Sequence, residues 1–219
     1  MRTVAFCEID PYCRRVLSHR WPGTPIHGDV RYLSGEGVGT VDVICGGFPC
    51  QDISRANPGE RAGVEGEHSG LWSEFARLIR ELRPRFVIVE NVPELLVRGM
   101  GRVIGDLASI GYDAEWDGIP AAAVGANHLR ARQWILAYPG SFRDGMETDS
   151  VLAGWPGFID RSRWANEPGV SRVDDGFPNR VDRRAALGNA VHPGITEAIG
   201  RCIMKAAGMG GDGRSTDGT

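Results

Sequence analysis

The chain has 219 residues, of which 42% are hydrophobic, and its formal net charge at pH 7 is −3. This length suits one domain with a small appendage, and no apolar run approaches the roughly 20 residues that a membrane-spanning helix needs. The first ten residues lack the long apolar core of a signal peptide, so we expect a cytoplasmic protein. The net charge does not indicate a nucleic-acid binder, so any such contact must come from local arginine clusters.

Short apolar runs bounded by turn residues alternate with helical stretches, which is the pattern of an α/β fold with a mainly parallel sheet. We predict strands over residues 3–8, 41–45, 86–90 and 133–137, and helices over residues 11–20, 69–82, 93–110 and about 194–207. Gly111 is expected to end the third helix. In doubly wound sheets ligands bind beyond the carboxyl ends of the strands, so chemistry is expected in the residues that follow them.

Residues 140–184 are rich in Gly, Pro, Asp and Arg without a clear period, and we interpret them as a loop-rich insert. The terminal GMGGDGRSTDGT cannot bury enough apolar surface to order itself, which predicts a disordered tail. The five cysteines include no Cys-x-x-Cys pair. Neither a disulfide framework nor a zinc site of that kind is therefore expected.

A cysteine follows the second predicted strand. Cys50 comes after two glycines and Pro49, on a loop that can bring its thiol into a cleft, where a thiolate acts as a nucleophile. Taken alone, Cys50 is better explained as a buried structural residue. Glu90 ends the next apolar strand at the same edge of the sheet, and a carboxylate there is costly to bury without a purpose. Its alternative role is to cap a helix that begins near Pro93.

Two arginines precede the last predicted strand. Arg130 and Arg132 are two residues apart, so on an extended chain both side chains point to one face. Two guanidinium groups on one face suit an anionic or carbonyl-rich ligand, although a solvated strand edge explains them as well. The segment LGNAVHP is a turn into the final helix, where backbone N–H groups can face a small molecule. By itself that signal is weak.

Together, in this order and spacing, these segments resemble the hallmark blocks of the DNA cytosine-5 methyltransferase family. The resembling blocks are Pro49–Gln51, Glu90–Val92, Arg130–Arg132 and Gly188–Val191. The resemblance extends from Arg2 to about Arg201. It implies an α/β fold, with the Rossmann-like sheet of methyltransferases that use S-adenosylmethionine and a short loop-rich target-recognition insert.

The resemblance also implies a reaction, in which the Cys50 thiolate adds to C6 of a cytosine so that C5 becomes an enamine-like carbon able to accept a methyl group. Glu90 would hydrogen-bond or protonate N3, and Arg132, with Arg130 beside it, would orient the base. Because C5 and C6 are stacked inside the duplex, the cytosine must be flipped out. The Gly-rich residues 52–68 are the expected lid, with an ordinary surface loop as the alternative.

S-adenosylmethionine is the implied methyl donor. By resemblance Glu8 would accept from the ribose hydroxyls, Ile9 would pack on the adenine, and Asp29 would accept from its exocyclic amine. Val30 is a further residue implied in cofactor binding. The residues implied at the methionine end are Pro49, Asn189 and Ala190. The alternative role of Asp10 and Asp29 is to cap a helix or turn, which is the commoner role of aspartate in such positions.

The family's first block, an aromatic-x-Gly-x-Gly turn after the first strand, is absent, so the sheet is expected to lack that strand. A start codon assigned too late, or a fragment that cannot catalyse, would each explain this. The predicted organisation is a catalytic core over residues 1–137, an insert over 138–186, a return to the core over 187–207 and a tail over 208–219.

The insert is short for the family, which suggests a phage or mobile-element enzyme of the restriction–modification kind. Its candidate DNA contacts are Trp155, Arg161, Arg163, Trp164, Arg172, Arg180, Arg183 and Arg184. Nearby acidic residues almost cancel these charges, so a solvated face remains an alternative. The expected partner is double-stranded DNA, with no membrane, no metal and a monomeric state.

Two other functions compete with a methyltransferase. The first is a non-catalytic relative that binds DNA, which only the missing first block supports. The second is a cysteine-nucleophile enzyme of another kind, such as an amidase, which would need a histidine base near the thiol. None of the five histidines lies in a motif that suggests one. Neither alternative explains the Gly-Asn-Ala-Val block.

Overall fold

A computed structural model of the chain describes residues 1–48, 71–144, 150–152 and 189–208. Cys50 and its neighbours Pro49 and Gln51 lie outside the described residues. So do the predicted lid over residues 52–68 and most of the predicted insert and tail.

The main sheet has four strands in the order β3-β4-β6-β5. They are β3 (Val43–Gly47), β4 (Phe86–Asn91), β5 (Tyr112–Pro120) and β6 (Ala131–Pro139). β3 and β4 are parallel, whereas β6 runs antiparallel to both β4 and β5. The α/β fold is confirmed, but the sheet is mixed. The prediction of a mainly parallel sheet was wrong because β5 was missed, and β5 and β6 form an antiparallel pair.

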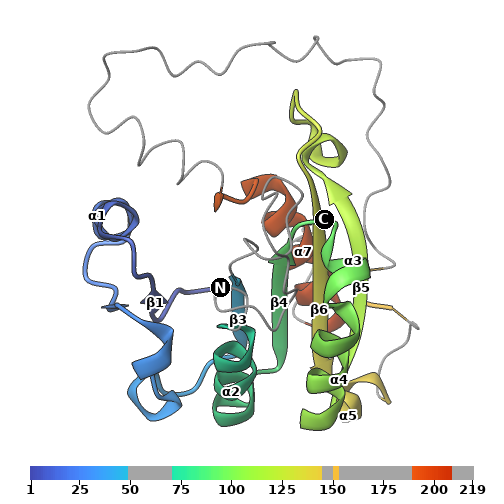
Figure 1. Cartoon of the computed structure of the whole chain (residues 1–219), viewed down its shortest axis with the longest axis horizontal. Helices are drawn as coiled ribbons and strands as arrows, with labels where there is room; N and C mark the ends of the chain where they lie inside the picture. Colours follow the sequence, from blue (N-terminus) through green and yellow to red (C-terminus); the bar gives the residue numbers. More distant parts are fainter. Residues whose placement is uncertain (49–70, 145–149, 153–188, 209–219) are drawn as a thin grey trace, which may run out of the picture.

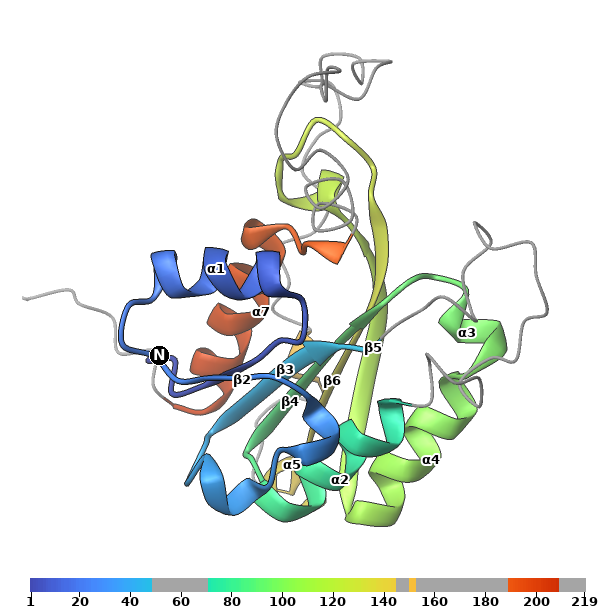
Figure 2. The ribbon, with the colours of Figure 1, turned by 60° about the vertical axis from the view of Figure 1, so that its left-hand side comes forward.

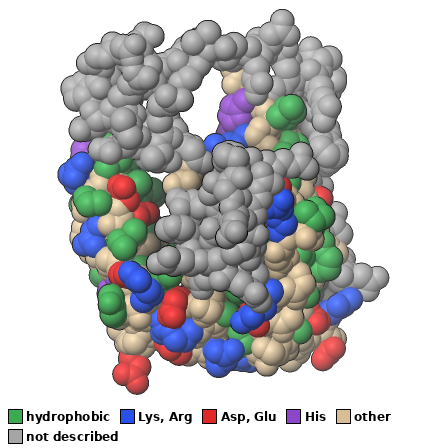
Figure 3. Space-filling view, in the orientation of Figure 1, with side chains coloured by type: hydrophobic (Ala, Val, Ile, Leu, Met, Phe, Trp, Pro, Cys, Tyr) green, Lys and Arg blue, Asp and Glu red, His purple; other side chains and the backbone are tan. Residues whose placement is uncertain are grey.

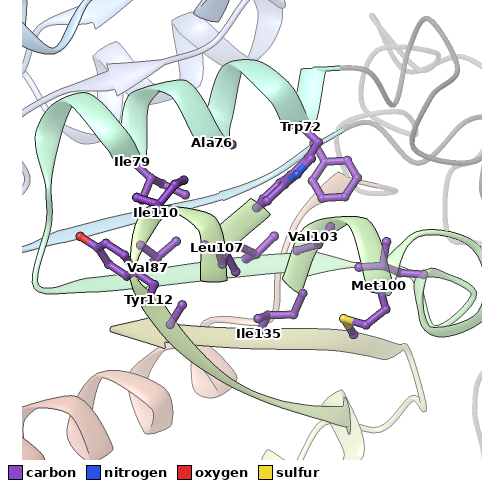
Figure 4. Close-up of a cluster of buried hydrophobic side chains, with 14 residues drawn as sticks. Trp72, Ala76, Ile79, Val87, Met100, Val103, Leu107, Ile110, Tyr112 and Ile135 are labelled. Atoms are coloured by element: carbon purple, nitrogen blue, oxygen red, sulfur yellow. The ribbon is translucent and has the colours of Figure 1, made fainter. Parts of the chain in front are cut away.

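Helices cover both faces of this sheet, giving three layers (Figure 2). α2 (Trp72–Leu82) and α4 (Met100–Ile110) lie on one face, and α7 (Pro193–Ala206) lies on the other. Figure 4 shows side chains of α2 and α4 converging on Val87 and Ile135 of the central strands. Even-numbered residues of β4 and β6, such as Ile88 and Leu136, instead pack with α7. This alternation determines which face each site residue takes.

The helices largely match the prediction. α1 (Pro11–Arg20) has the predicted bounds and is capped by Asp10, whose carboxylate accepts from the backbone N–H groups of Tyr12 and Cys13. The predicted helix over residues 93–110 is two helices, α3 (Leu95–Arg98) and α4, which break at Gly99. Gly111 ends α4 in the left-handed region at φ 88°, as predicted. A further short helix, α5 (Gly140–Arg143), follows β6.

A second, two-stranded sheet precedes the main one in the chain. β1 (Phe6–Cys7) and β2 (Ile26–His27) form a parallel pair, and α1 connects them in the chain. β1 is shorter than the strand predicted over residues 3–8. Figure 1 shows β1 on the β3 side of the main sheet. Among the described residues, β1 is hydrogen-bonded only to β2, and β3 only to β4. Each of these two strands therefore has a second edge with no described strand beside it.

The surface charge of the described residues is mixed. Figure 3 shows basic and acidic side chains interspersed over the lower half of one face, without a large area of one sign. This agrees with the small net charge of the chain. None of the described helices is long and apolar enough to cross a membrane.

Candidate active site

Glu90 lies next to the end of β4, opposite Gly47 of β3 on one side and Trp134 of β6 on the other. Its side chain is only 14% exposed. A Cβ atom added to Gly47 would lie 3.0 Å from both the backbone oxygen and Oε2 of Glu90. The glycine at position 47 therefore provides the space that the Glu90 carboxylate occupies.

Arg132 is the charged partner of Glu90. Its Nε atom lies 3.0 Å from Glu90 Oε1, and its side chain is 22% exposed. Burial raises the pKa of Glu90, although the charges of Arg132 and Arg130 oppose this effect. The carboxyl group consequently stays protonated to a higher pH than an ordinary glutamate, even beside a guanidinium group.

Asn91 connects the end of β4 to the segment that follows β3. Its side-chain amide is buried and donates from Nδ2 to the carbonyl oxygen of Phe48 at 3.2 Å, while its Oδ1 accepts from the N–H of Val92 at 2.8 Å. Phe48 is two residues before Cys50 in the sequence. The contact therefore ties the chain leading to Cys50 to the strand that carries Glu90. This role of Asn91 was not predicted, although the sequence carries its signal, an amide side chain at the end of an apolar strand.

Arg130 lies just before β6 and adopts a left-handed backbone conformation at φ 28°. The prediction that both arginines project from one extended segment was therefore wrong, because the strand begins only at Ala131. Arg130 donates from Nη2 to the carbonyl oxygen of Ala190, in the segment before α7. Burial and the charge of Arg132 lower the pKa of Arg130, while Glu90 opposes them. The structure thus brings Glu90, Arg130 and Arg132 into one electrostatic cluster.

The residues expected at the cofactor lie in two places. Glu8 and Asp29 follow the carboxyl ends of the paired strands β1 and β2, with the N–H of Glu8 donating to the carbonyl oxygen of His27. Glu8 Oε1 accepts from the N–H of Asp10 at 2.7 Å, and the apolar side chain of Ile9 is 65% exposed. The second group, Asn189 and Ala190, is exposed and precedes α7.

Asp29 also has a structural role. It caps the 3₁₀ helix η1 (Val30–Tyr32) by accepting from the N–H of Arg31 at 2.9 Å. Its carboxylate is paired with the Arg31 guanidinium at 2.6 Å as well. This pairing with Arg31 lowers the pKa of Asp29. The capping roles considered for Asp10 and Asp29 are therefore both present.

Comparisons with known proteins show the family of this chain. The sequence model described as C-5 cytosine-specific DNA methylase matches residues 1–149. The chain belongs to this family. Similar curated proteins include the type II methyltransferase M2.BsuMI of Bacillus subtilis, 31% identical over 177 residues, and M.CviJI of Paramecium bursaria Chlorella virus IL3A, 32% identical over 176 residues. These alignments cover 74% and 78% of this chain but 44% and 45% of the relatives, so the chain spans less than half of their length.

Solved structures show the same fold. A prophage-encoded protein of Escherichia coli, assigned as a DNA modification methyltransferase, superposes with a TM-score of 0.55 at 24% identity and covers 70% of this chain and 44% of its own. A mutant of Spodoptera frugiperda DNMT2 gives a TM-score of 0.52 at 18% identity and covers 78% of this chain and 49% of its own. The expected Rossmann-like α/β fold is therefore confirmed.

Proposed function

We propose that this chain transfers a methyl group from S-adenosylmethionine to C5 of cytosine in double-stranded DNA, through a covalent adduct with Cys50. The observation that carries the proposal is the contact between Glu90 and Arg132 at 3.0 Å, at the edge of the sheet where β3 leads toward Cys50. A carboxyl group whose pKa is raised by burial, next to a guanidinium group, can contact both N3 and the carbonyl oxygen of one cytosine. Family membership supplies the reaction class.

The chain's own residues would work in sequence. Arg132 donates to the carbonyl oxygen of the flipped base, and Glu90 donates its proton to N3, which makes C6 more electrophilic. The Cys50 thiolate then forms a bond to C6, and the displaced electron pair makes C5 nucleophilic. C5 takes the methyl group, and a base removes the proton from C5 as the C6–S bond breaks with return of the electron pair to sulfur. N3 returns its proton to Glu90, which restores the site.

S-adenosylmethionine supplies an electrophilic methyl group when it is bound. Glu8 fits its ribose, because the carboxylate lies beyond the end of β1 and only its Oε1 atom has a described backbone contact. The exposed side chain of Ile9 fits the flat face of an adenine. Arg31 already donates to both carboxylate oxygens of Asp29. Asp29 can therefore accept from the adenine amine only with a lone pair that Arg31 does not use. Val30 would lie beside the adenine, and Pro49, Asn189 and Ala190 at the methionine end.

The edges of β1 and β3 that have no described strand beside them bear on the activity. We infer that a further parallel strand pairs with β3 in the active protein, because an open strand edge presents backbone N–H and C=O groups that another strand can pair with. The alignments cover less than half of each relative, so more than half of each relative's sequence is available to supply such a strand. A chain lengthened to the nearest upstream in-frame start should transfer more methyl groups than the present chain. Equal rates would show that β3 needs no further neighbour.

The experiment that tests the reaction is transfer of tritium from labelled S-adenosylmethionine to mixed-sequence duplex DNA. Cys50→Ser should abolish turnover and leave DNA binding, measured by fluorescence anisotropy, intact. Cys45→Ser is the matched control, because Cys45 is an exposed cysteine of β3 that has no part in the proposed chemistry. Turnover by the Cys50→Ser variant would exclude Cys50 as the nucleophile.

The second candidate function is DNA binding without methylation. The separation of β1 and β2 from the main sheet is the observation that favours it. It predicts that neither length of the chain transfers tritium while both bind duplex DNA. Transfer by either length would exclude it.

A further inference from the structure

The start of α7 depends on an unprotonated histidine. His192 is the N-cap of this helix, and its Nδ1 atom accepts from the backbone N–H of Gly194 at 3.2 Å. A backbone N–H can only donate, so Nδ1 must carry a free lone pair and the imidazole must be neutral. Protonation of Nδ1 would remove this contact and leave a donor at the first turn of α7 without its partner.

A second histidine and an arginine lie near His192. The His128 ring lies 5.9 Å from the His192 ring, measured between centroids, at an interplanar angle of 63°. Arg130 also acts on His192, and the first turn of α7 holds no acidic residue that would offset the charge of this arginine. Burial, then His128 and Arg130, lower the pKa of His192, so the ring keeps its neutral form to a lower pH than an ordinary histidine.

The helix start is also closely packed against the rest of the chain. A Cβ atom on Gly194 would lie 3.2 Å from Val124, at the end of the 3₁₀ helix η5 (Ala121–Val124). It would lie 3.3 Å from the His192 ring as well. This packing leaves little space for α7 to shift, so a change in the His192 contact should act on the segment that precedes the helix.

The segment before α7 is hydrogen-bonded to one of the arginines of the site. Ala190, two residues before His192, accepts from Nη2 of Arg130 through its carbonyl oxygen. Arg130 in turn acts electrostatically on Glu90 and Arg132. Hydrogen bonds therefore connect the start of α7 and the Ala190 carbonyl to Arg130, whose charge acts on the Glu90–Arg132 pair.

We propose that neutral His192 is a positioning residue, which holds the segment before α7 so that the Ala190 carbonyl fixes Arg130 beside Glu90 and Arg132. This inference rests on the proposed methyl transfer for its functional consequence, but not for its geometry. When His192 takes up a proton, the contact with Gly194 is lost and a second positive charge lies near that of Arg130. Arg130 then loses its fixed place, and transfer falls as the pH is lowered.

Asparagine tests this proposal, because it caps helices well and does not titrate. The rates of methyl transfer of the wild type, His192→Asn and His192→Ala are compared from pH 8 to pH 5.5. Both proteins contain Cys50 and Glu90. Any pH dependence of the rate that these two residues cause therefore cancels in the ratio of the His192→Asn rate to the wild-type rate. We expect this ratio to rise as the pH falls, by up to about tenfold per pH unit below the pKa of His192. His192→Ala should be slower than His192→Asn at every pH.

The matched control is His19→Asn, which removes a histidine from α1. Its rate relative to the wild type should not change with pH. A constant ratio for His192→Asn, or equal rates for the asparagine and alanine variants, would overturn the proposal.

A second measurement does not depend on catalysis. Nitrogen NMR of the full chain reports which ring nitrogen of His192 carries hydrogen. We expect an unprotonated Nδ1 at pH 8, and a midpoint of unfolding that falls with pH more steeply in the wild type than in His192→Asn. A hydrogen on Nδ1 at pH 8 would overturn the proposal even in a chain without methyl transfer. A free Nδ1 in an inactive chain would instead count against the proposed function alone.

Discussion

At the scale of single residues, Glu90 shows how the fold sets the chemistry of one side chain. Burial favours the neutral carboxyl group, while Arg132 at 3.0 Å and Arg130 favour the carboxylate, and burial is the larger effect on its pKa. A glutamate that retains its proton can donate to a base. The same environment makes the ionised form a cost to folding.

Replacement of Glu90 by glutamine separates these two consequences. We expect Glu90→Gln to lower methyl transfer by roughly 100-fold or more, the usual contribution of a general acid. Because the pKa of Glu90 is raised on folding, its contribution to stability is complete below the pKa of the unfolded chain and is lost as the pH rises through the pKa of the folded chain. Glutamine resembles the neutral form, so thermal unfolding at pH 8 should show no loss of stability.

Glu36→Gln is the control for this substitution, because Glu36 lies in the exposed turn η2 (Gly35–Gly37). It should change neither quantity. A Glu90→Gln variant that was clearly less stable than the wild type at pH 8 would show that the ionised pair with Arg132 stabilises the fold.

Two adjacent glycines of β3 offer a test of the space around Glu90. A Cβ at position 47 would meet Glu90 at 3.0 Å, which is too close, whereas one at position 46 would lie at an ordinary 3.6 Å from Phe75. Gly47→Ala should therefore reduce methyl transfer by at least about tenfold through displacement of the carboxylate. Gly46→Ala should retain most of the activity. Similar rates for both variants would show that Glu90 adjusts freely.

At the scale of elements, local sequence signals predicted some structures well and others poorly. α1 was predicted to the residue because Asp10 and Pro11 form a strong start signal. β5 was missed, although Asp113, Glu115 and Asp117 alternate with apolar residues as in an edge strand. The break between α3 and α4 at Gly99 had only a single glycine as its signal, and the helical pattern continues across it.

Glu115 of β5 holds the short described segment that follows residues 145–149. Its carboxylate accepts from Tyr138 and Ser150 hydroxyl groups and from the N–H groups of Val151 and Leu152. Burial acts to raise the pKa of Glu115, but these four hydrogen bonds together lower it. One side chain thus ties residues 150–152 to the β5–β6 pair.

We expect Glu115→Gln to destabilise the chain by roughly 1–2 kcal/mol at pH 7, because an amide nitrogen would face hydrogen-bond donors. Since the pKa of Glu115 is lowered on folding, its contribution is present above the unfolded pKa and is lost as the pH falls through the folded one. The difference between variant and wild type in urea unfolding should therefore shrink in acid. Asp117→Asn, a change at an exposed position of the same strand, is the control. A constant difference at all pH values would contradict this account of Glu115.

At the scale of the whole molecule, the family resemblance implied that Glu90 and Arg132 act together, but the predicted parallel sheet did not explain how they meet. They come together because β6 runs antiparallel to β4, which places the start of β6 beside the end of β4. The contacts of Asn91 with Phe48, and of Arg130 with Ala190, join segments more than 40 residues apart. No local pattern encodes such contacts, because they depend on the packing of the complete sheet. The placement of Cys50 itself stays a prediction, as it lies outside the described residues.

The central claim is that Cys50 attacks a cytosine whose C5 then takes a methyl group. Its most direct test is to incubate the chain, at both lengths, with S-adenosylmethionine and duplex DNA that carries 5-fluorocytosine. Fluorine replaces the proton that must leave C5, so the adduct cannot resolve by elimination. The account predicts a DNA–protein complex that survives denaturation, with the modified base attached to Cys50 in peptide mass spectra. Absence of a complex at both lengths, or attachment to any other residue, would contradict it.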